Sequence, residues 1–129
     1  MSDLVLDASA LLAMLQGERG AAKVAAVIAG ARMSVVNYAE VVSHFIRLGM
    51  PPLDVEAMLN PLPIDLVPAD KALAQLAGRL RATTADAGLS LGDRFCLALA
   101  LRDGLPAWTA AKAWRVIADA AGVKVTLIR

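Results

Sequence analysis

Cysteine, histidine and aromatic residues are scarce in this 129-residue chain, and each scarcity disfavours a class of function. The lone cysteine, Cys96, has no partner for an internal disulfide, which is typical of a reducing compartment, and we expect it to be a small buried hydrophobe. Aromatic residues make up 4% of the chain, which leaves few rings for stacking unpaired bases and disfavours a passive RNA-binding module. The sequence has one histidine, no phosphate-cradling glycine loop and no nucleophile-elbow pattern, so nothing in it calls for a protein nucleophile.

A long hydrophobic run and a strong charge imbalance are also missing. Hydrophobic residues make up 58% of the chain, yet no apolar run reaches the roughly 18 to 20 residues that span a bilayer. We therefore expect no membrane association, and we expect the apolar helix faces to be buried in the core. No basic segment precedes the first apolar stretch and Asp7 interrupts it, so we expect no signal peptide and a cytoplasmic location. Because the net charge is only +1, any contact with RNA must use a local patch.

Short apolar runs alternate with segments of helical spacing, and at this length we expect one domain, 1–129. The expected strands are 4–6, 33–36, 64–67, 105–109 and 123–128, and the expected helices are 8–16, 21–29, 37–48, 53–59, 69–87, 90–102 and 111–121. Parallel neighbours need a crossover connection, and both faces of such a sheet must be covered. The pattern therefore predicts an α/β fold with a mostly parallel central sheet between two layers of helices.

Three acidic residues occupy positions where parallel sheets form sites. Asp7 ends the first expected strand in LVLDASALLA, Glu40 lies in VVNYAEVV, and Asp93 lies in GLSLGDRFCLALA. Sites in such sheets form at the carboxyl ends of strands, where we expect Asp7, and we expect Glu40 and Asp93 in the first turns of helices. An unpaired charge buried at Asp7 would be costly, which favours a functional role for this residue.

Helix capping is the competing explanation for two of these carboxylates. Glu40 lies three residues after Asn37, and Asp93 lies three residues after Ser90, so both pairs fit the capping-box pattern. An acidic residue in the first turn also interacts favourably with the helix dipole. Taken one at a time, Glu40 and Asp93 are explained equally well by the start of a helix.

Taken together, the three carboxylates favour a divalent cation. Like charges that converge in one crevice repel each other unless a cation compensates them. Magnesium and manganese take carboxylate oxygens and water, and they often bind through only one or two protein carboxylates. The sequence therefore predicts a Mg2+ site, with Mn2+ as the alternative metal.

These segments resemble those of the PIN-domain ribonucleases, above all the VapC-like toxins of bacterial toxin–antitoxin pairs, and the resemblance runs the whole chain. It implies a PIN-like three-layer α/β/α sandwich and a metal-dependent endoribonuclease that hydrolyses RNA phosphodiesters. It further implies Asp7, Glu40 and Asp93 as catalytic metal ligands, with Ser9 and Thr109 as auxiliary residues that orient water or substrate. Hydrogen bonds at a helix start explain the two hydroxyls equally well. The implied partners are an RNA substrate, a cognate antitoxin protein and a second copy of the chain in a homodimer.

One position departs from the family pattern. A fourth acidic residue normally follows a Thr-Ala pair after a late strand, but this chain reads WTAAK over 108–112, so Ala111 stands where an aspartate is expected. The missing carboxylate weakens a second metal more than a first, so we expect one well-held metal. Asp103 and Asp119 lie too far along their helices to replace it. Asp86 stays open as a replacement.

Basic residues near the expected mouth of the site have simpler explanations than catalysis. His44 lies four residues after Glu40, and we interpret the two as a pair on one helix face without a catalytic role. Arg94, Lys112 and Arg115 are candidates for phosphate contacts, and an ordinary solvated surface explains them nearly as well.

Two functions follow from these observations. The leading hypothesis is the ribonuclease toxin of a toxin–antitoxin module. The alternative is a catalytically impaired PIN-fold protein that still binds antitoxin or RNA, because Ala111 replaces the fourth acid. An acidic-pocket phosphatase or signalling receiver fits less well, since the Asp7 segment has no second aspartate two residues on and no adjacent acidic pair.

Overall fold

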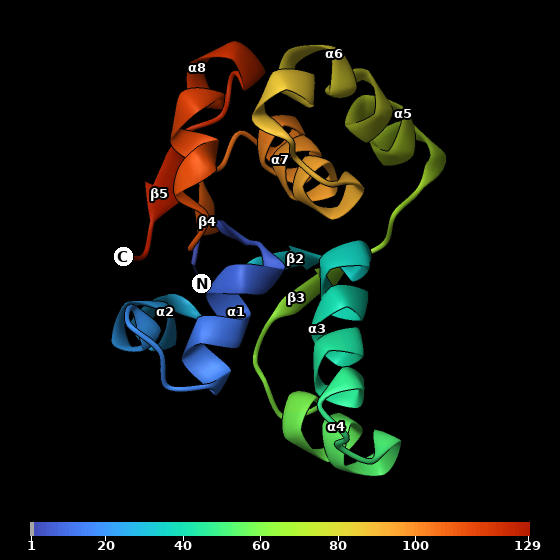
Figure 1. The fold of residues 1–129 in the computed structure, drawn as a ribbon, viewed down its shortest axis with the longest axis vertical. Coiled ribbons are helices and arrows are strands. Elements are labelled where there is room, and N and C mark those ends of the chain that lie inside the picture. Colours follow the sequence, from blue (N-terminus) through green and yellow to red (C-terminus); the bar gives the residue numbers. More distant parts are fainter. Residues whose placement is uncertain (1) are drawn as a thin grey trace.

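The computed structural model describes residues 2–129, which form a five-stranded, wholly parallel sheet (Figure 1). The strands are β1 (Val5–Leu6), β2 (Arg32–Ser34), β3 (Asp65–Val67), β4 (Ala107–Thr109) and β5 (Val125–Leu127). Their order across the sheet is β3-β2-β1-β4-β5, which puts β1 in the centre. In register, Leu6 pairs with Trp108, so the ends of β1 and β4 lie side by side. The two segments that follow these strands are therefore neighbours.

Helices cover both faces of the sheet (Figure 1). One face carries α1 (Ala8–Leu15), α2 (Ala21–Val27), α3 (Val35–Arg47) and α4 (Pro52–Leu59). The other carries α5 (Lys71–Arg79), α6 (Arg81–Thr84), α7 (Leu91–Asp103) and α8 (Ala118–Ala121), with the 3-10 turns η1 (Ala85–Ala87) and η2 (Lys112–Val116). Among the described helices, none is both long and apolar enough to cross a membrane.

The core consists of two clusters, one on each face. Successive side chains of a strand point to opposite faces, and β1 shows this directly. Val5 packs with Leu97 of α7, whereas Leu6 packs with Leu11 of α1. All of these side chains are fully buried. The arrangement confirms the predicted α/β/α sandwich.

The start of α3 differs from the prediction. We expected a strand through Val36 and a helix from Asn37, but the strand ends at Ser34 and the helix begins at Val35. The Ser34 hydroxyl caps this helix by accepting a hydrogen bond from the backbone nitrogen of Val36 (3.2 Å). The predicted Asn37–Glu40 capping box is therefore wrong. Glu40 lies in the second turn, so its position is not explained by a helix start.

Two other long helices are divided. The segment 69–87 forms α5, α6 and η1, and the segment 111–121 forms η2 followed by the single turn of α8. Trp114 of η2 is 1% exposed and anchors this irregular segment against α7 and its neighbours. The chain directly after β4 is therefore an extended turn, and Ala111 adopts a β conformation instead of starting a helix.

Candidate active site

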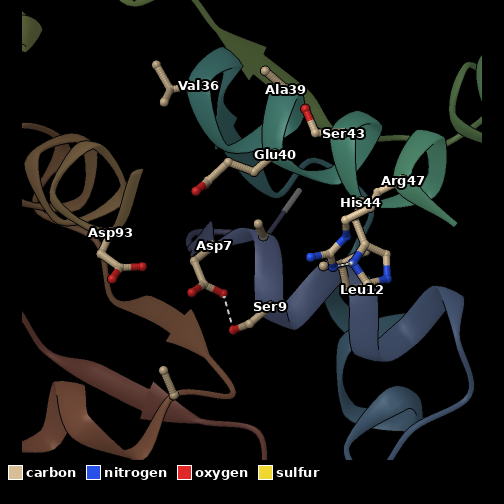
Figure 2. Close-up of a pocket in the computed structure, with 12 residues that line it drawn as sticks. Asp7, Ser9, Leu12, Val36, Ala39, Glu40, Ser43, His44, Arg47 and Asp93 are labelled. Atoms are coloured by element: carbon tan, nitrogen blue, oxygen red, sulfur yellow. Dashed lines mark hydrogen bonds between the residues drawn. The ribbon is translucent and has the colours of Figure 1, made fainter. Parts of the chain in front are cut away.

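A cavity of about 700 Å³ opens at the edge of the sheet where β1 and β4 end (Figure 2). Its lining residues come from α1, α3, α7 and the turn after β4 and are Asp7, Ala8, Ser9, Leu12, Val36, Ala39, Glu40, Ser43, His44, Arg47, Asp93 and Ala111. All three predicted acidic residues are among them. Figure 2 shows the side chains of Asp7, Glu40 and Asp93 pointing toward a common space from three different elements.

Asp7 lies at the bottom of this cavity and caps α1. The residue is 3% exposed, and its Oδ1 accepts hydrogen bonds from the backbone nitrogen of Ala10 (2.9 Å) and from the hydroxyl of Ser9 (2.7 Å). Its Oδ2 accepts a hydrogen bond from the hydroxyl of Thr109 (2.8 Å), at the end of β4. Both oxygens are therefore held, and the orientation of the carboxylate is set by groups from two neighbouring strand ends.

Ser9 and Thr109 form a clamp between these two strand ends. Their hydroxyl oxygens lie 3.2 Å apart. The backbone nitrogen of Ala110 donates to Ser9 (2.9 Å), and that of Ala111 donates to Thr109 (3.0 Å). A helix start alone does not explain the two hydroxyls, because both also donate to Asp7. The clamp fixes Asp7 and the turn that carries Ala111 relative to each other.

Burial raises the pKa of Asp7 from its ordinary value of 3.8 to about 6. Removing a carboxylate from water disfavours its charged form, and this cost exceeds the stabilising effect of the three hydrogen bonds. The negative charge of Asp93 raises the pKa of Asp7 further. The site therefore holds its central charge against an electrostatic penalty that a cation would remove.

Glu40 is positioned by a single amide. Asn37, which is 1% exposed, donates from Nδ2 both to Oε1 of Glu40 (2.8 Å) and to the backbone oxygen of Gly92 (2.9 Å). This amide ties α3 to the first turn of α7. A Cβ added at Gly92 would overlap the Glu40 carboxylate, so the close approach of these two groups requires glycine.

The pKa of Glu40 is raised as well. The residue as a whole is exposed, but its carboxylate lies against Asn37 and Gly92, and this partial desolvation is the main cause. The charge of Asp93 contributes in the same direction. Asp93 thus acts electrostatically on both Asp7 and Glu40, which indicates that the three carboxylates share one local field.

Asp93 has a structural role that the sequence predicted. Ser90 caps α7, and the capping box is complete: the backbone nitrogen of Ser90 donates to Oδ2 of Asp93 (2.9 Å), and the backbone nitrogen of Asp93 donates to the Ser90 hydroxyl (3.2 Å). The capping box engages Oδ2 and leaves Oδ1 for another partner. Capping and a functional role are therefore compatible at this residue.

The donor set fits magnesium or manganese. It consists of carboxylate oxygens around one cavity with hydroxyls beneath them, and these metals bind through few protein carboxylates and complete their coordination with water. Within residues 2–129 no three His, Cys, Asp or Glu side chains converge closely enough to enclose a metal by themselves. The arrangement is an open acidic cavity, and the mutual repulsion of its three carboxylates favours a bound cation.

Several residues lie elsewhere than predicted. His44 is within hydrogen-bond distance of Gln16 and Arg47, so the predicted pairing with Glu40 is wrong. Arg94 is buried and donates to the backbone oxygen of Ala77 (3.3 Å), because α7 packs its side chain against α5. Lys112 and Arg115 also lie outside the cavity lining: Lys112 is exposed, and Arg115 lines a separate cavity. Asp86 is exposed on η1 outside this lining, so it does not replace the missing carboxylate. Asp103 lies outside the lining as predicted and pairs with Arg32 and Arg102.

Three residues of the site were missed by sequence reasoning. The sequence pattern predicts Asn37 as a helix cap and gives no signal for Gly92. Arg47 also lines the cavity. The sequence did carry a signal for it, because Arg47 follows Glu40 by seven residues and therefore shares its helix face. Ala111 does line the cavity, so the position where the family has an acid is part of the site and carries no charge.

A family model described as PIN domain matches residues 4–120 of this chain. No curated protein gives a significant sequence match. The chain is similar to a toxin–antitoxin complex from Klebsiella pneumoniae, at 20% identity over 99% of this chain and 98% of that one, with a TM-score of 0.73.

Two further solved structures have the same fold. DNA-bound VapBC from Salmonella typhimurium is 15% identical over 100% of both chains, with a TM-score of 0.75. FitAcB from Neisseria gonorrhoeae is 19% identical over 97% of both chains, with a TM-score of 0.64. At these identities the likeness establishes the arrangement of the chain, and the chemistry rests on the residues of the cavity.

The burial of Asp7 makes the stability of the fold depend on pH. Because the pKa of Asp7 is higher in the folded state, ionising it costs folding free energy, and this cost develops as pH rises from 3.8 to about 6. We expect Asp7→Asn to gain about 3 kcal/mol of stability relative to the native chain over this range. Urea unfolding at a series of pH values, with chelator present, measures the difference. A difference that does not change with pH would contradict the burial of this charge.

The second prediction concerns the contact between Glu40 and Gly92. In Gly92→Ala the added methyl group displaces the Glu40 carboxylate toward solvent, so its pKa falls toward the ordinary value while α7 stays folded. Carboxyl-detected NMR titration of Glu40 gives the pKa. The matched control is Gly78→Ala, since a Cβ at Gly78 meets nothing within 4 Å. Equal Glu40 midpoints in native chain and Gly92→Ala would show that this contact does not set its environment.

Proposed function

The chain belongs to the PIN domain family, whose model spans residues 4–120, and from this premise we propose that it is a metal-dependent endoribonuclease acting as the toxin of a toxin–antitoxin pair. One observation carries the proposal: Asp7, Glu40 and Asp93 line one cavity at the carboxyl ends of parallel strands. None of the three is needed there for a hydrophobic core, and two have raised pKa values. Carboxylates in such an arrangement are typical of a site for divalent cations.

In this proposal Asp7, Glu40 and Asp93 hold Mg2+ or Mn2+, and water completes the coordination. When bound, such an ion polarises a phosphate oxygen and lowers the pKa of a water molecule so that it can attack phosphorus. Ser9 and Thr109 keep both Asp7 oxygens in place. Asn37 holds Oε1 of Glu40. The chain's own contribution is to present three carboxylates in fixed orientations before substrate arrives.

The proposed partner is an antitoxin protein, because the similar structures from Klebsiella pneumoniae and Salmonella typhimurium are toxin–antitoxin and VapBC complexes. A groove of about 400 Å³ between α3 and α4 supports this partner, since amphipathic helices bind in grooves that offer apolar and polar contacts side by side. Its lining includes the apolar residues Val42, Ile46 and Leu59 and the polar residues Glu56 and Asn60. A homodimer is also proposed. This part of the proposal rests on the family alone, since single exposed apolar residues such as Leu53 of α4 and Val116 of η2 are ordinary at a protein surface.

Ala111 favours a second candidate function. The cavity wall at this position carries a methyl group instead of a carboxylate, so the site has one negative charge fewer than the family pattern provides. A chain with this change can keep its fold, groove and RNA contacts while its turnover falls. The alternative is therefore a catalytically impaired PIN-fold protein that binds antitoxin or RNA.

Cleavage of a panel of structured RNAs in Mg2+ and in Mn2+ tests both candidates. We expect the native chain to cleave, Asp7→Asn to lose about 100-fold or more, and Ala111→Asp to gain about tenfold through the restored carboxylate. Asp86→Asn, which changes an exposed acid outside the cavity, is the control and should cleave like the native chain.

The remaining outcomes separate the candidates. A silent native chain with an active Ala111→Asp variant would identify the binding protein. If the native chain and Ala111→Asp are both silent where a control nuclease cuts, the nuclease proposal is wrong.

A further inference from the structure

One face of α3 presents both an acidic and a basic side chain at the cavity. Glu40, Ser43, His44 and Arg47 all line it, and their spacing of three, four and seven residues places them on one stripe of the helix. Glu40 and Arg47 lie two turns apart, or roughly 10 Å along the helix axis. The carboxylate end of the cavity therefore continues into a basic end along a single rigid element.

Arg47 is held at this basic end by a neighbour. Its guanidinium nitrogen NH2 lies 3.3 Å from Nδ1 of His44, and Nε2 of His44 lies 2.9 Å from the side-chain amide of Gln16 on the segment after α1. Figure 2 shows the Arg47 and His44 side chains together beside Leu12, on the far side of Ser9 from Asp93. Because a guanidinium can only donate, Nδ1 of His44 is the acceptor in this contact. His44 thus bridges two helices and orients Arg47.

The charge of Arg47 is not neutralised by a neighbour. Within residues 2–129 the ion pairs involve Arg32, Arg102 and Arg129, and Arg47 takes part in none of them. Arg47 is an exposed residue of the last turn of α3, where a cation interacts favourably with the helix dipole, but that effect does not require its side chain to lie at the rim of the cavity beside His44. Most of the guanidinium donors remain available to a ligand that enters the cavity.

We propose that Arg47, positioned by His44, binds a phosphate of the RNA strand next to the one that reaches the carboxylates. This inference rests on the proposed function and adds Arg47 as the group that sets the position of the RNA strand along the cavity. The carboxylates attract a metal and repel any phosphate that the metal does not contact. Arg47 offers a planar set of donors suited to phosphate oxygens at the other end of the cavity. The strand is then fixed at two points, which places one phosphodiester at the site.

The test measures binding of a short single-stranded RNA in which a methylene group replaces the leaving bridging oxygen of each linkage. Each linkage keeps its charge, but attack of water on phosphorus cannot expel a carbon leaving group. Fluorescence anisotropy in Mg2+ at several salt concentrations gives the affinity and its salt dependence. We expect Arg47→Gln to weaken binding about threefold to tenfold and to lower the slope of log affinity against log salt by about 0.7, the value of one phosphate contact on a single strand. Arg47→Lys should retain most of the slope. Arg79→Gln, an exposed arginine of α5, is the control and should not change either quantity.

A second arm locates the contact. One linkage at a time is replaced by an uncharged methylphosphonate, and we expect a single linkage beside the cleaved bond whose replacement weakens binding to the native chain but not to Arg47→Gln. His44→Ala should weaken binding less than Arg47→Gln does, and the double variant should be no weaker than Arg47→Gln alone. These results distinguish a phosphate contact from a general loss of structure.

The outcomes separate this inference from the proposed function. If the native chain cleaves unmodified RNA while Arg47→Gln binds with the native affinity and salt slope, the role of Arg47 is wrong and the nuclease proposal stands. If the native chain neither binds nor cleaves RNA, both are overturned. An Arg79→Gln effect equal to that of Arg47→Gln would show that diffuse charge explains the binding, which also overturns the role of Arg47.

Discussion

The buried charge of Asp7 is the constraint on which the rest of the site depends. A carboxylate at the end of the central strand is unfavourable unless its surroundings hold it, and they do so with Ser9, the backbone nitrogen of Ala10 and Thr109. Thr109 reaches Asp7 only because β4 runs parallel to β1 in a register that pairs Leu6 with Trp108. The topology of the sheet thus brings Thr109 next to the end of the first strand. The hydrogen bonds do not fully offset the cost of burying the Asp7 charge, and the remaining cost favours a cation beside it.

The other carboxylates reach the cavity through a contact between two helices. Asn37 joins Glu40 to the backbone of Gly92, and the next residue, Asp93, completes the capping box of α7. One short sequence, Ser90 to Asp93, therefore starts the helix, admits the Glu40 carboxylate and supplies a third charge. Because the same residues serve folding and the site, changes to this segment act on both, and stability has to be measured beside any activity.

The sequence predicted the alternation of strands and helices, the burial of Asp7 and the Ser90–Asp93 cap, since each rests on local pattern. It misplaced the start of α3, because Val35 and Val36 favour a strand by propensity while the Ser34 hydroxyl and packing against α7 stabilise a helix. Arg94 was read as a surface charge, and only the packing of α7 on α5 shows that it is buried. The Asn37 link spans 55 residues of sequence and depends on tertiary contacts that no local pattern contains.

The proposed function requires that Asp7, Glu40 and Asp93 share one divalent cation. Crystals soaked in Mn2+ and measured at the manganese absorption edge test it most directly, because the anomalous signal locates the metal without reference to activity. We expect one peak in the cavity, about 2.1 Å from carboxylate oxygens of at least two of these residues, with no second peak beside Ala111. An empty cavity under conditions where manganese binds elsewhere on the molecule, or a peak that contacts none of the three carboxylates, would contradict it.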